Sequence, residues 1–233
     1  MAGGPSQRDG LPTRLRDWRP HPDPAAAVIA AAAPRRAAAL TVALLLTAIM
    51  RSLLLPIGEL AAAVGFVIAL AGLLVVERRM DSVLSRHPHP TLPTRGREIG
   101  QQRSETPFWL GAAAGVGVGL VLLLPVMGAA ASGRPLSGFW GWGAAIVVIA
   151  TLEEVVLRGR LQPAWTAEAG PVAGLVLSAA VFALIHLPRY GLGAMPLDFA
   201  VGLALGGLRA VTGRVAPCAI AHVIADWGAW FWL

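Results

Sequence analysis

Three apolar stretches in the C-terminal half of this sequence carry ionisable residues at spacings that could support acid–base chemistry. They are Glu153, Glu154 and Arg158 after the apolar residues 138–152, His186 in VFALIHLP, and His222 with Asp226 in AIAHVIADW. Ionisable groups at membrane depth are costly, and they usually mark a functional site. These six residues are therefore the candidate catalytic residues.

The spacing of these residues along a helix predicts which side chains can pair. Residues four apart lie on one face of a helix, so Glu154 can pair with Arg158, and His222 can pair with Asp226. Glu153 is rotated by about 100° from Glu154, so its carboxylate stays clear of that arginine. A carboxylate without an ionic partner can act as a general base while its neighbour is held ionised.

Composition places these stretches in a membrane protein. The chain has 233 residues, of which 56% are hydrophobic and 14% charged, with a mean hydropathy of +0.65. Soluble domains are typically about 25% charged. We predict an all-α, polytopic transmembrane bundle of seven spans, or eight if Ala25–Ala33 also inserts. The expected spans are residues 37–55, 59–76, 108–131, 138–157, 172–187, 197–208 and 215–233.

The spans divide the chain into three regions. These are a disordered cytoplasmic tail at 1–36, N-terminal spans at 37–137 with a cytoplasmic loop at 77–107, and a catalytic core at 138–233. All 19 basic residues are arginines. They concentrate at alternate span ends, with Arg51, Arg134 and Arg189 as exceptions, which predicts a cytoplasmic N-terminus and a multi-pass protein of the cell membrane. The membrane topology explains the basic balance, so no nucleic-acid partner is expected.

The three motifs, in this order, resemble the CPBP intramembrane proteases, the CAAX protease and bacteriocin-processing or Abi family. The matching residues are E-E-x-x-x-R at Glu153, Glu154 and Arg158, F-x-x-x-H at Phe182 and His186, and H-x-x-x-N/D at His222 and Asp226. The resemblance covers about residues 138–230. Asp226 stands where many members carry Asn.

The resemblance implies an intramembrane endopeptidase that acts on a membrane-associated or leader-type peptide. The implied roles are water activation by Glu153 with His186, substrate positioning or oxyanion stabilisation by His222 with Asp226, and support of the geometry by Glu154 with Arg158. Two histidines and a glutamate are also an adequate zinc ligand set, but the HExxH spacing is absent. Metal-free water activation is favoured, and a divalent metal stays open.

The depth of these residues sets a condition on the helices. For Glu153, His186 and His222 to meet, the helix that carries Glu153 must continue past Arg160 to about Trp165. The three side chains should then lie within about 4–8 Å of one another, close enough for one water to bridge them. We expect them about 15–18 Å deep, in a mid-membrane cavity that opens to the cytoplasm.

Two other function classes also use buried polar residues. A non-enzymatic immunity or scaffold protein is one, although it has no need of an unpaired glutamate. A proton-coupled transporter is the other, and it relays protons through buried Glu and His. Transporters usually carry internal repeats, and no repeat is apparent in this sequence. His87 and His89, in an H-P-H-P run, are interpreted as loop residues rather than metal ligands.

Overall fold

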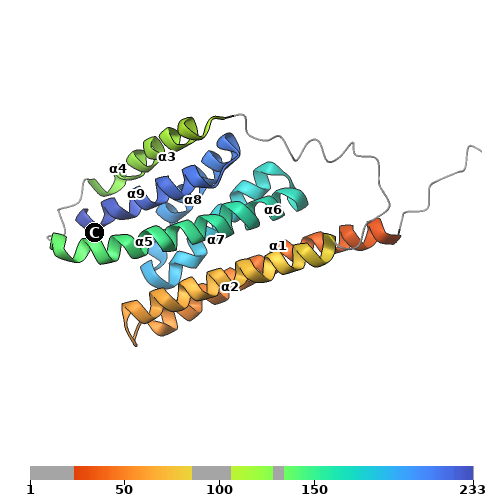
Figure 1. Cartoon of the computed structure of the whole chain (residues 1–233), viewed down its shortest axis with the longest axis horizontal. Helices are drawn as coiled ribbons and strands as arrows, with labels where there is room; N and C mark the ends of the chain where they lie inside the picture. The colour runs from red at the N-terminus through yellow and green to blue at the C-terminus, as the bar shows by residue number, and fades with distance from the viewer. Residues whose placement is uncertain (1–23, 86–105, 128–133, 233) are drawn as a thin grey trace, which may run out of the picture. The chain divides into compact units, whose positions relative to one another are not determined.

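The computed structural model describes residues 24–85, 106–127 and 134–232, and all regular secondary structure in these ranges is helical (Figure 1). The longer helices are α1 (Pro24–Leu54), α2 (Glu59–Ser85), α3 (Phe108–Leu122), α5 (Leu136–Val156), α7 (Pro171–Tyr190), α8 (Met195–Thr212) and α9 (Ala216–Trp232). The shorter ones are α4 (Leu124–Met127), the π-helix η3 (Leu157–Leu161), α6 (Gln162–Ala169) and the 3₁₀ helix η4 (Leu192–Ala194). Met1–Ala32 separates from Ala33–Leu233 as a unit of its own, and the contacts below all lie within the larger unit.

Five of the described helical segments are long and apolar enough to cross a membrane. They are Arg36–Leu54, Glu59–Ser82, Leu136–Ala169, Pro171–Tyr190 and Leu192–Thr212. The helices α3 and α9 are shorter, with 15 and 17 residues. Together these helices follow the order of the predicted spans, so the prediction of an all-α, multi-pass membrane bundle is confirmed. Residues 25–33, the candidate eighth span, fall inside α1 and form no separate helix.

The first helix begins earlier than the sequence analysis expected. α1 starts at Pro24, inside the segment 1–36 that was expected to be disordered. The run after Pro24 is rich in alanine, the residue with the highest helix propensity, and this favours the helical start. Residues 1–23 lie outside the described part of the chain.

The second helix also extends further than predicted. α2 continues to Ser85, so the first nine residues of the predicted loop 77–107 are helical. Glu77 is buried and forms an ion pair with Arg36, which gives this polar segment a partner inside the bundle. The histidines at 87 and 89 lie outside the described residues.

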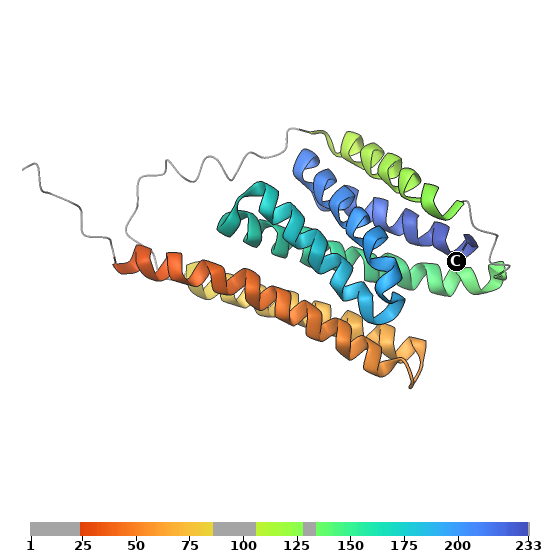
Figure 2. The same cartoon turned by 180° about the vertical axis from the view of Figure 1, so that it is seen from behind.

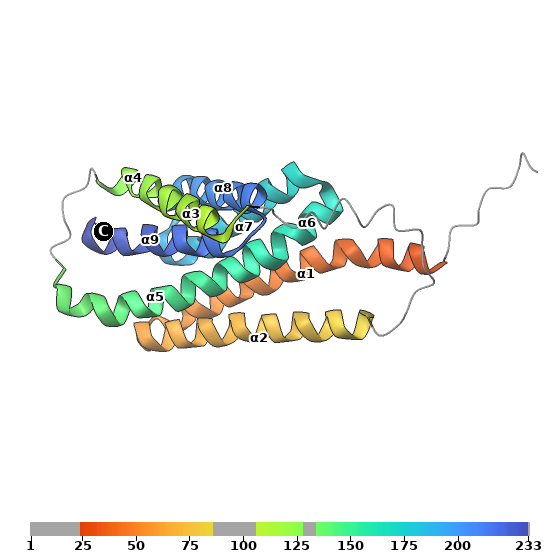
Figure 3. The same cartoon turned by 45° about the horizontal axis from the view of Figure 1, so that its top comes forward.

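The long helix α5–η3–α6 is lined on one side by α1. Ala37 N donates a hydrogen bond to Glu168 Oε1 at 3.3 Å, and Arg51, further along α1, lies 3.8 Å from Glu153. The two helices therefore run antiparallel. α2 returns beside α1, and Figures 1, 2 and 3 show the two lying side by side. Apolar side chains of α1, α2, α5 and α7 form the main buried core.

The helices α3 and α9 pack closely and run parallel, and Figure 3 shows them side by side. The glycine repeat of α3 faces α9, where a Cβ added at Gly115 would lie 2.5 Å from Pro217 O. One turn later, a Cβ at Gly119 would lie 3.0 Å from Ala221 O. Such approach of two backbones requires residues without side chains at the contact. The repeat is therefore used for packing within the chain.

The helices alternate in direction, so their ends gather at two ends of the bundle. We call one of them the basic end; there α2, α6 and α8 finish, and α3, α7 and α9 begin. Its arginines are Arg35, Arg36, Arg78, Arg79, Arg160, Arg209 and Arg214. The other, which we call the opposite end, holds the α1–α2 and α7–α8 turns, joined by an ion pair between Arg189 and Glu59 at 3.1 Å. The arginines at this opposite end are Arg51, Arg134 and Arg189.

Candidate active site

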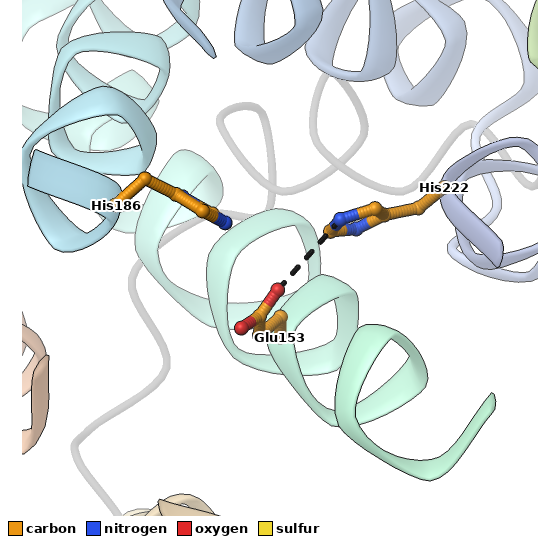
Figure 4. A group of neighbouring side chains, drawn as sticks. All are labelled: Glu153, His186 and His222. Atoms are coloured by element: carbon orange, nitrogen blue, oxygen red, sulfur yellow. Dashed lines mark ion pairs between the residues drawn. The ribbon is translucent and has the colours of Figure 1, made fainter. Parts of the chain in front are cut away.

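Three ionisable side chains from three helices meet inside the bundle. Glu153 comes from α5, His186 from α7 and His222 from α9, and one nitrogen or oxygen atom of each lies within 4.8 Å of the others. Figure 4 shows both imidazole rings directed toward the Glu153 carboxylate. The predicted meeting of these three residues is confirmed. We call Glu153, His186 and His222 the central cluster.

The helix that carries Glu153 continues as the depth argument required. The segment Leu136–Ala169 forms one helical span, and it ends at Gly170, whose φ of 88° breaks the helix. The sequence did not indicate the π-helix η3, in which Gln162 N donates to Leu157 O, five residues back. Single π turns occur frequently at functional sites.

The pair Glu154–Arg158 is completely buried. Arg158 Nη1 lies 3.0 Å from Glu154 Oε1, and neither side chain has any exposed area. Arg158 Nη2 donates to Gly202 O at 3.0 Å, and the guanidinium lies 4.8 Å above the Phe182 ring. A Cβ at Gly202 would lie 2.9 Å from the Cα of Ala179, so only glycine lets α8 come this near. The guanidinium is thus held by three different helices.

His222 is oriented by the second glutamate. Its Nδ1 lies 3.0 Å from Glu154 Oε1, so Nδ1–H donates to that carboxylate. Its Nε2 then faces Glu153 Oε2 at 3.8 Å and Asp226 Oδ2 at 3.7 Å. The predicted pairing of His222 with Asp226 is present, and the contact with Glu154 is an addition that spacing within one helix could not reveal.

His186 is fixed by its own helix. Its Nδ1 lies 2.8 Å from Phe182 O, four residues earlier, so Nδ1–H donates to that carbonyl. The ring packs against Phe182 on one side, with centroids 4.4 Å apart, and stacks on Tyr190 at 5.8 Å. Because Nδ1 is engaged, Nε2 is the ring nitrogen that can accept a hydrogen bond or bind a metal in the central cluster.

Sequence reasoning missed one residue of the site. Arg51 of α1 lies with Nη1 3.8 Å from Glu153 Oε1, and its guanidinium covers the Phe66 ring at 4.6 Å. Glu153 is therefore not without a cationic neighbour, as its spacing from Arg158 had suggested. The only signal was an arginine near the end of an apolar span. Spacing does not tell which face of α1 meets α5, because that depends on the packing of both helices.

The distance of the central cluster from the basic end also differs from the predicted depth. Glu153 lies 16 residues before the end of α6, about 24 Å from the basic end, instead of about 15–18 Å. His186 lies only four residues, about 6 Å, before the end of α7 at the opposite end. Glu153 lies about midway along α5–η3–α6, and His222 lies six residues after α9 begins at the basic end, so the three helices contribute to the cluster at different points of their lengths. The estimate failed because the helix runs to Ala169 rather than to about Trp165.

The central cluster has the donor set of a metal site. Two imidazole nitrogens and a carboxylate oxygen suit zinc. Both Nδ1–H groups are engaged, one with Phe182 O and the other with Glu154. Such hydrogen bonds commonly fix the ring orientation of histidines that bind metals. One observation opposes a metal: the guanidinium of Arg51 beside Glu153 would repel a dication.

Comparison with known families agrees with these motifs. Residues 135–228 match the family described as type II CAAX prenyl endopeptidase Rce1-like. This range holds all six candidate residues in one continuous match. The C-terminal region of the chain is therefore similar to the CAAX protease family. No curated protein and no solved structure shows a significant match to the chain.

The similarity of residues 135–228 to the CAAX protease family bears on the choice between the function classes. It supports a CAAX-type intramembrane endopeptidase over the transporter and the scaffold. The match begins just before α5, so α1 and α2 lie outside it. Arg51 therefore reaches the central cluster from a part of the chain that the family match does not cover.

Proposed function

We propose that this protein hydrolyses a peptide bond of a membrane-associated or leader-type peptide, with water activated between Glu153 and His186. The observation that carries the proposal is the central cluster, a carboxylate and two imidazoles within 4.8 Å of one another. Glu153 and His222 are almost fully buried, so the groups act in a site with little bulk water. Electrostatic interactions are stronger in such surroundings than in water.

Glu153 is the general base of the proposed reaction. Its carboxylate takes a proton from the water, whose oxygen attacks the scissile carbonyl carbon, and later gives that proton to the leaving amine. His186 Nε2 accepts a hydrogen bond from the same water and aims it, since its Nδ1 is held by Phe182 O. Arg51 is a positioning residue that keeps the Glu153 carboxylate turned toward α1 until the water is bound.

His222 stabilises the oxyanion. Three carboxylates lie within 3.8 Å of its ring, those of Glu153, Glu154 and Asp226. These carboxylates balance the positive charge of a protonated His222 ring. Its Nε2–H can then donate to the negative oxygen of the tetrahedral intermediate. Stabilisation of this kind is usually the largest contribution to catalysis. Glu154 and Arg158 act as positioning residues, because the carboxylate between them fixes Nδ1 of His222.

We favour the glutamate-type reaction over a metal-dependent one. The repulsion that Arg51 would exert on a dication supports this choice, as does the missing HExxH spacing. Were a divalent metal bound, Glu153, His186 and His222 would hold it, and it would supply Lewis-acid activation of water.

The test compares the membrane proteomes of cells that carry the wild type, Glu153→Gln or the control Glu59→Gln. The amide of Glu153→Gln cannot accept a proton, so uncleaved precursors should accumulate. Glu59 has an exposed side chain at the start of α2, and its change should leave processing as in the wild type. Identical peptide ends in the wild type and Glu153→Gln would overturn the proposal.

A further inference from the structure

Tyr190, the one tyrosine of the sequence, is the last residue of α7 and lies against the central cluster. Gly191 follows with a φ of 75° and stops the helix there. The tyrosine ring stacks on the ring of His186, four residues earlier, with centroids 5.8 Å apart and planes only 12° from parallel. No step of the proposed hydrolysis uses its hydroxyl.

The stack on His186 does not account for the hydroxyl of Tyr190. The imidazole also packs against Phe182, with ring centroids 4.4 Å apart, so an aromatic ring without a polar atom is sufficient for such a contact. A phenylalanine at position 190 would offer the same ring. Tyrosine is an aromatic residue with one polar end, and that end usually finds a hydrogen-bond partner inside proteins. The hydroxyl therefore requires an explanation of its own.

Charged groups from three helices act on this hydroxyl. Tyr190 interacts electrostatically with Asp226 of α9, with Arg51 of α1 and with Arg189, its neighbour in α7. The Arg189 guanidinium lies 5.7 Å from the centroid of the tyrosine ring. A guanidinium only donates hydrogen bonds, so any bond from either arginine uses a lone pair of the hydroxyl oxygen. The O–H of the tyrosine then stays free to donate.

Two of these charged neighbours also touch the central cluster. Arg51 Nη1 lies 3.8 Å from Glu153 Oε1, and Asp226 Oδ2 lies 3.7 Å from His222 Nε2. The tyrosine is therefore linked to the proposed base through α1 and to the proposed oxyanion donor through α9. A peptide whose scissile carbonyl lies between Glu153 and His222 would pass within reach of the hydroxyl.

We propose that Tyr190 is a substrate-binding residue, whose hydroxyl donates a hydrogen bond to a backbone carbonyl oxygen of the peptide beside the scissile bond. The inference rests on the proposed peptidase function and adds a contact that fixes the position of the peptide chain along the central cluster. Tyrosine is also enriched at membrane surfaces, but an anchor of that kind requires no parallel stack on a residue of the site.

Steady-state cleavage by Tyr190→Phe tests this inference. The probe is a fluorogenic peptide that spans a cleavage site of a precursor accumulated in Glu153→Gln cells. Tyr190→Phe keeps the ring beside His186 and loses only the hydroxyl. KM should rise by about 2–10-fold with kcat unchanged, because the lost hydrogen bond is made equally in the bound substrate and in the transition state.

Trp140→Phe is the matched control for an exposed aromatic residue at the opposite end of the bundle. Trp140 lies near the start of α5 and is 75% exposed, and its change should leave KM as in the wild type. An unchanged KM for Tyr190→Phe would overturn the inference. A fall in kcat at constant KM would also overturn it, since the hydroxyl would then act through Asp226 and His222. An equal rise of KM in Trp140→Phe would overturn it as well, by indicating an anchor in the membrane.

Binding of the same peptide to inactive variants separates this inference from the proposed function. Glu153→Gln/Tyr190→Phe should bind the peptide about 2–10-fold more weakly than Glu153→Gln. Equal dissociation constants would overturn the role of Tyr190 and leave the proposed function standing. Cleavage by Glu153→Gln would overturn the proposed base and leave the difference in binding. If no precursor accumulates in Glu153→Gln cells, the proposed function and the inference that rests on it are both overturned.

Discussion

Arg158→Ala should destabilise the protein strongly, because it leaves Glu154 buried without a cation. The change removes the 3.0 Å contact with Glu154, the hydrogen bond to Gly202 O and the guanidinium above Phe182. Breaking a buried pair by removing one partner costs about 3–5 kcal/mol. Since about 1.4 kcal/mol is a factor of ten, the folding equilibrium should change by at least about a hundredfold.

Arg160→Ala is the matched control. Arg160 lies two residues away and pairs with Asp81 at 3.2 Å, but both side chains are partly exposed, so its loss should cost about 0–1 kcal/mol. The assay is thermal unfolding of both purified variants in the same detergent. The double variant Arg158→Ala/Glu154→Gln should recover part of the loss, because the unpaired charge is gone. Equal stability of Arg158→Ala and Arg160→Ala would refute the reasoning.

Three further predictions concern packing and chemistry. Gly202→Ala should lower the melting temperature, because its Cβ would lie 2.9 Å from the Cα of Ala179. Gly207→Ala is the control, since no atom lies within 4 Å of its new Cβ, and equal melting temperatures of the two variants would contradict this packing. His222→Ala should lower kcat by about 10²–10³ by removing the oxyanion donor, and activity within a few-fold of wild type would assign that role elsewhere. Chelation of divalent metals should leave turnover unchanged, while a loss that zinc restores would show the metallo-type reaction.

Local features of the site were predictable from the sequence. The pairs Glu154–Arg158 and His222–Asp226 follow from a separation of four residues in one helix, and both are present. For Glu153 to meet the two histidines, its helix had to continue past Arg160. The helical span Leu136–Ala169 does so, and the three residues meet. These predictions succeeded because helical periodicity and membrane depth are properties of single segments.

The contacts that could not be predicted join different helices. Arg209 Nε of α8 donates to Arg158 O, in the π-helix η3, at 3.2 Å. Arg51 reaches Glu153 from α1, and His222 reaches Glu154 from α9. Each contact depends on the rotation of one helix against another. Hydropathy and motif spacing within one segment carry no information on that rotation.

The most direct test of the proposed chemistry is turnover by purified Glu153→Gln in liposomes, measured with a peptide whose cleavage by the wild type has been established. Glu59→Gln serves as the matched control at the start of α2. Glu153→Gln should remain folded and inserted but should cleave none of the peptide, because its amide cannot take a proton from water. Normal cleavage by Glu153→Gln would contradict the assignment of Glu153 as the general base.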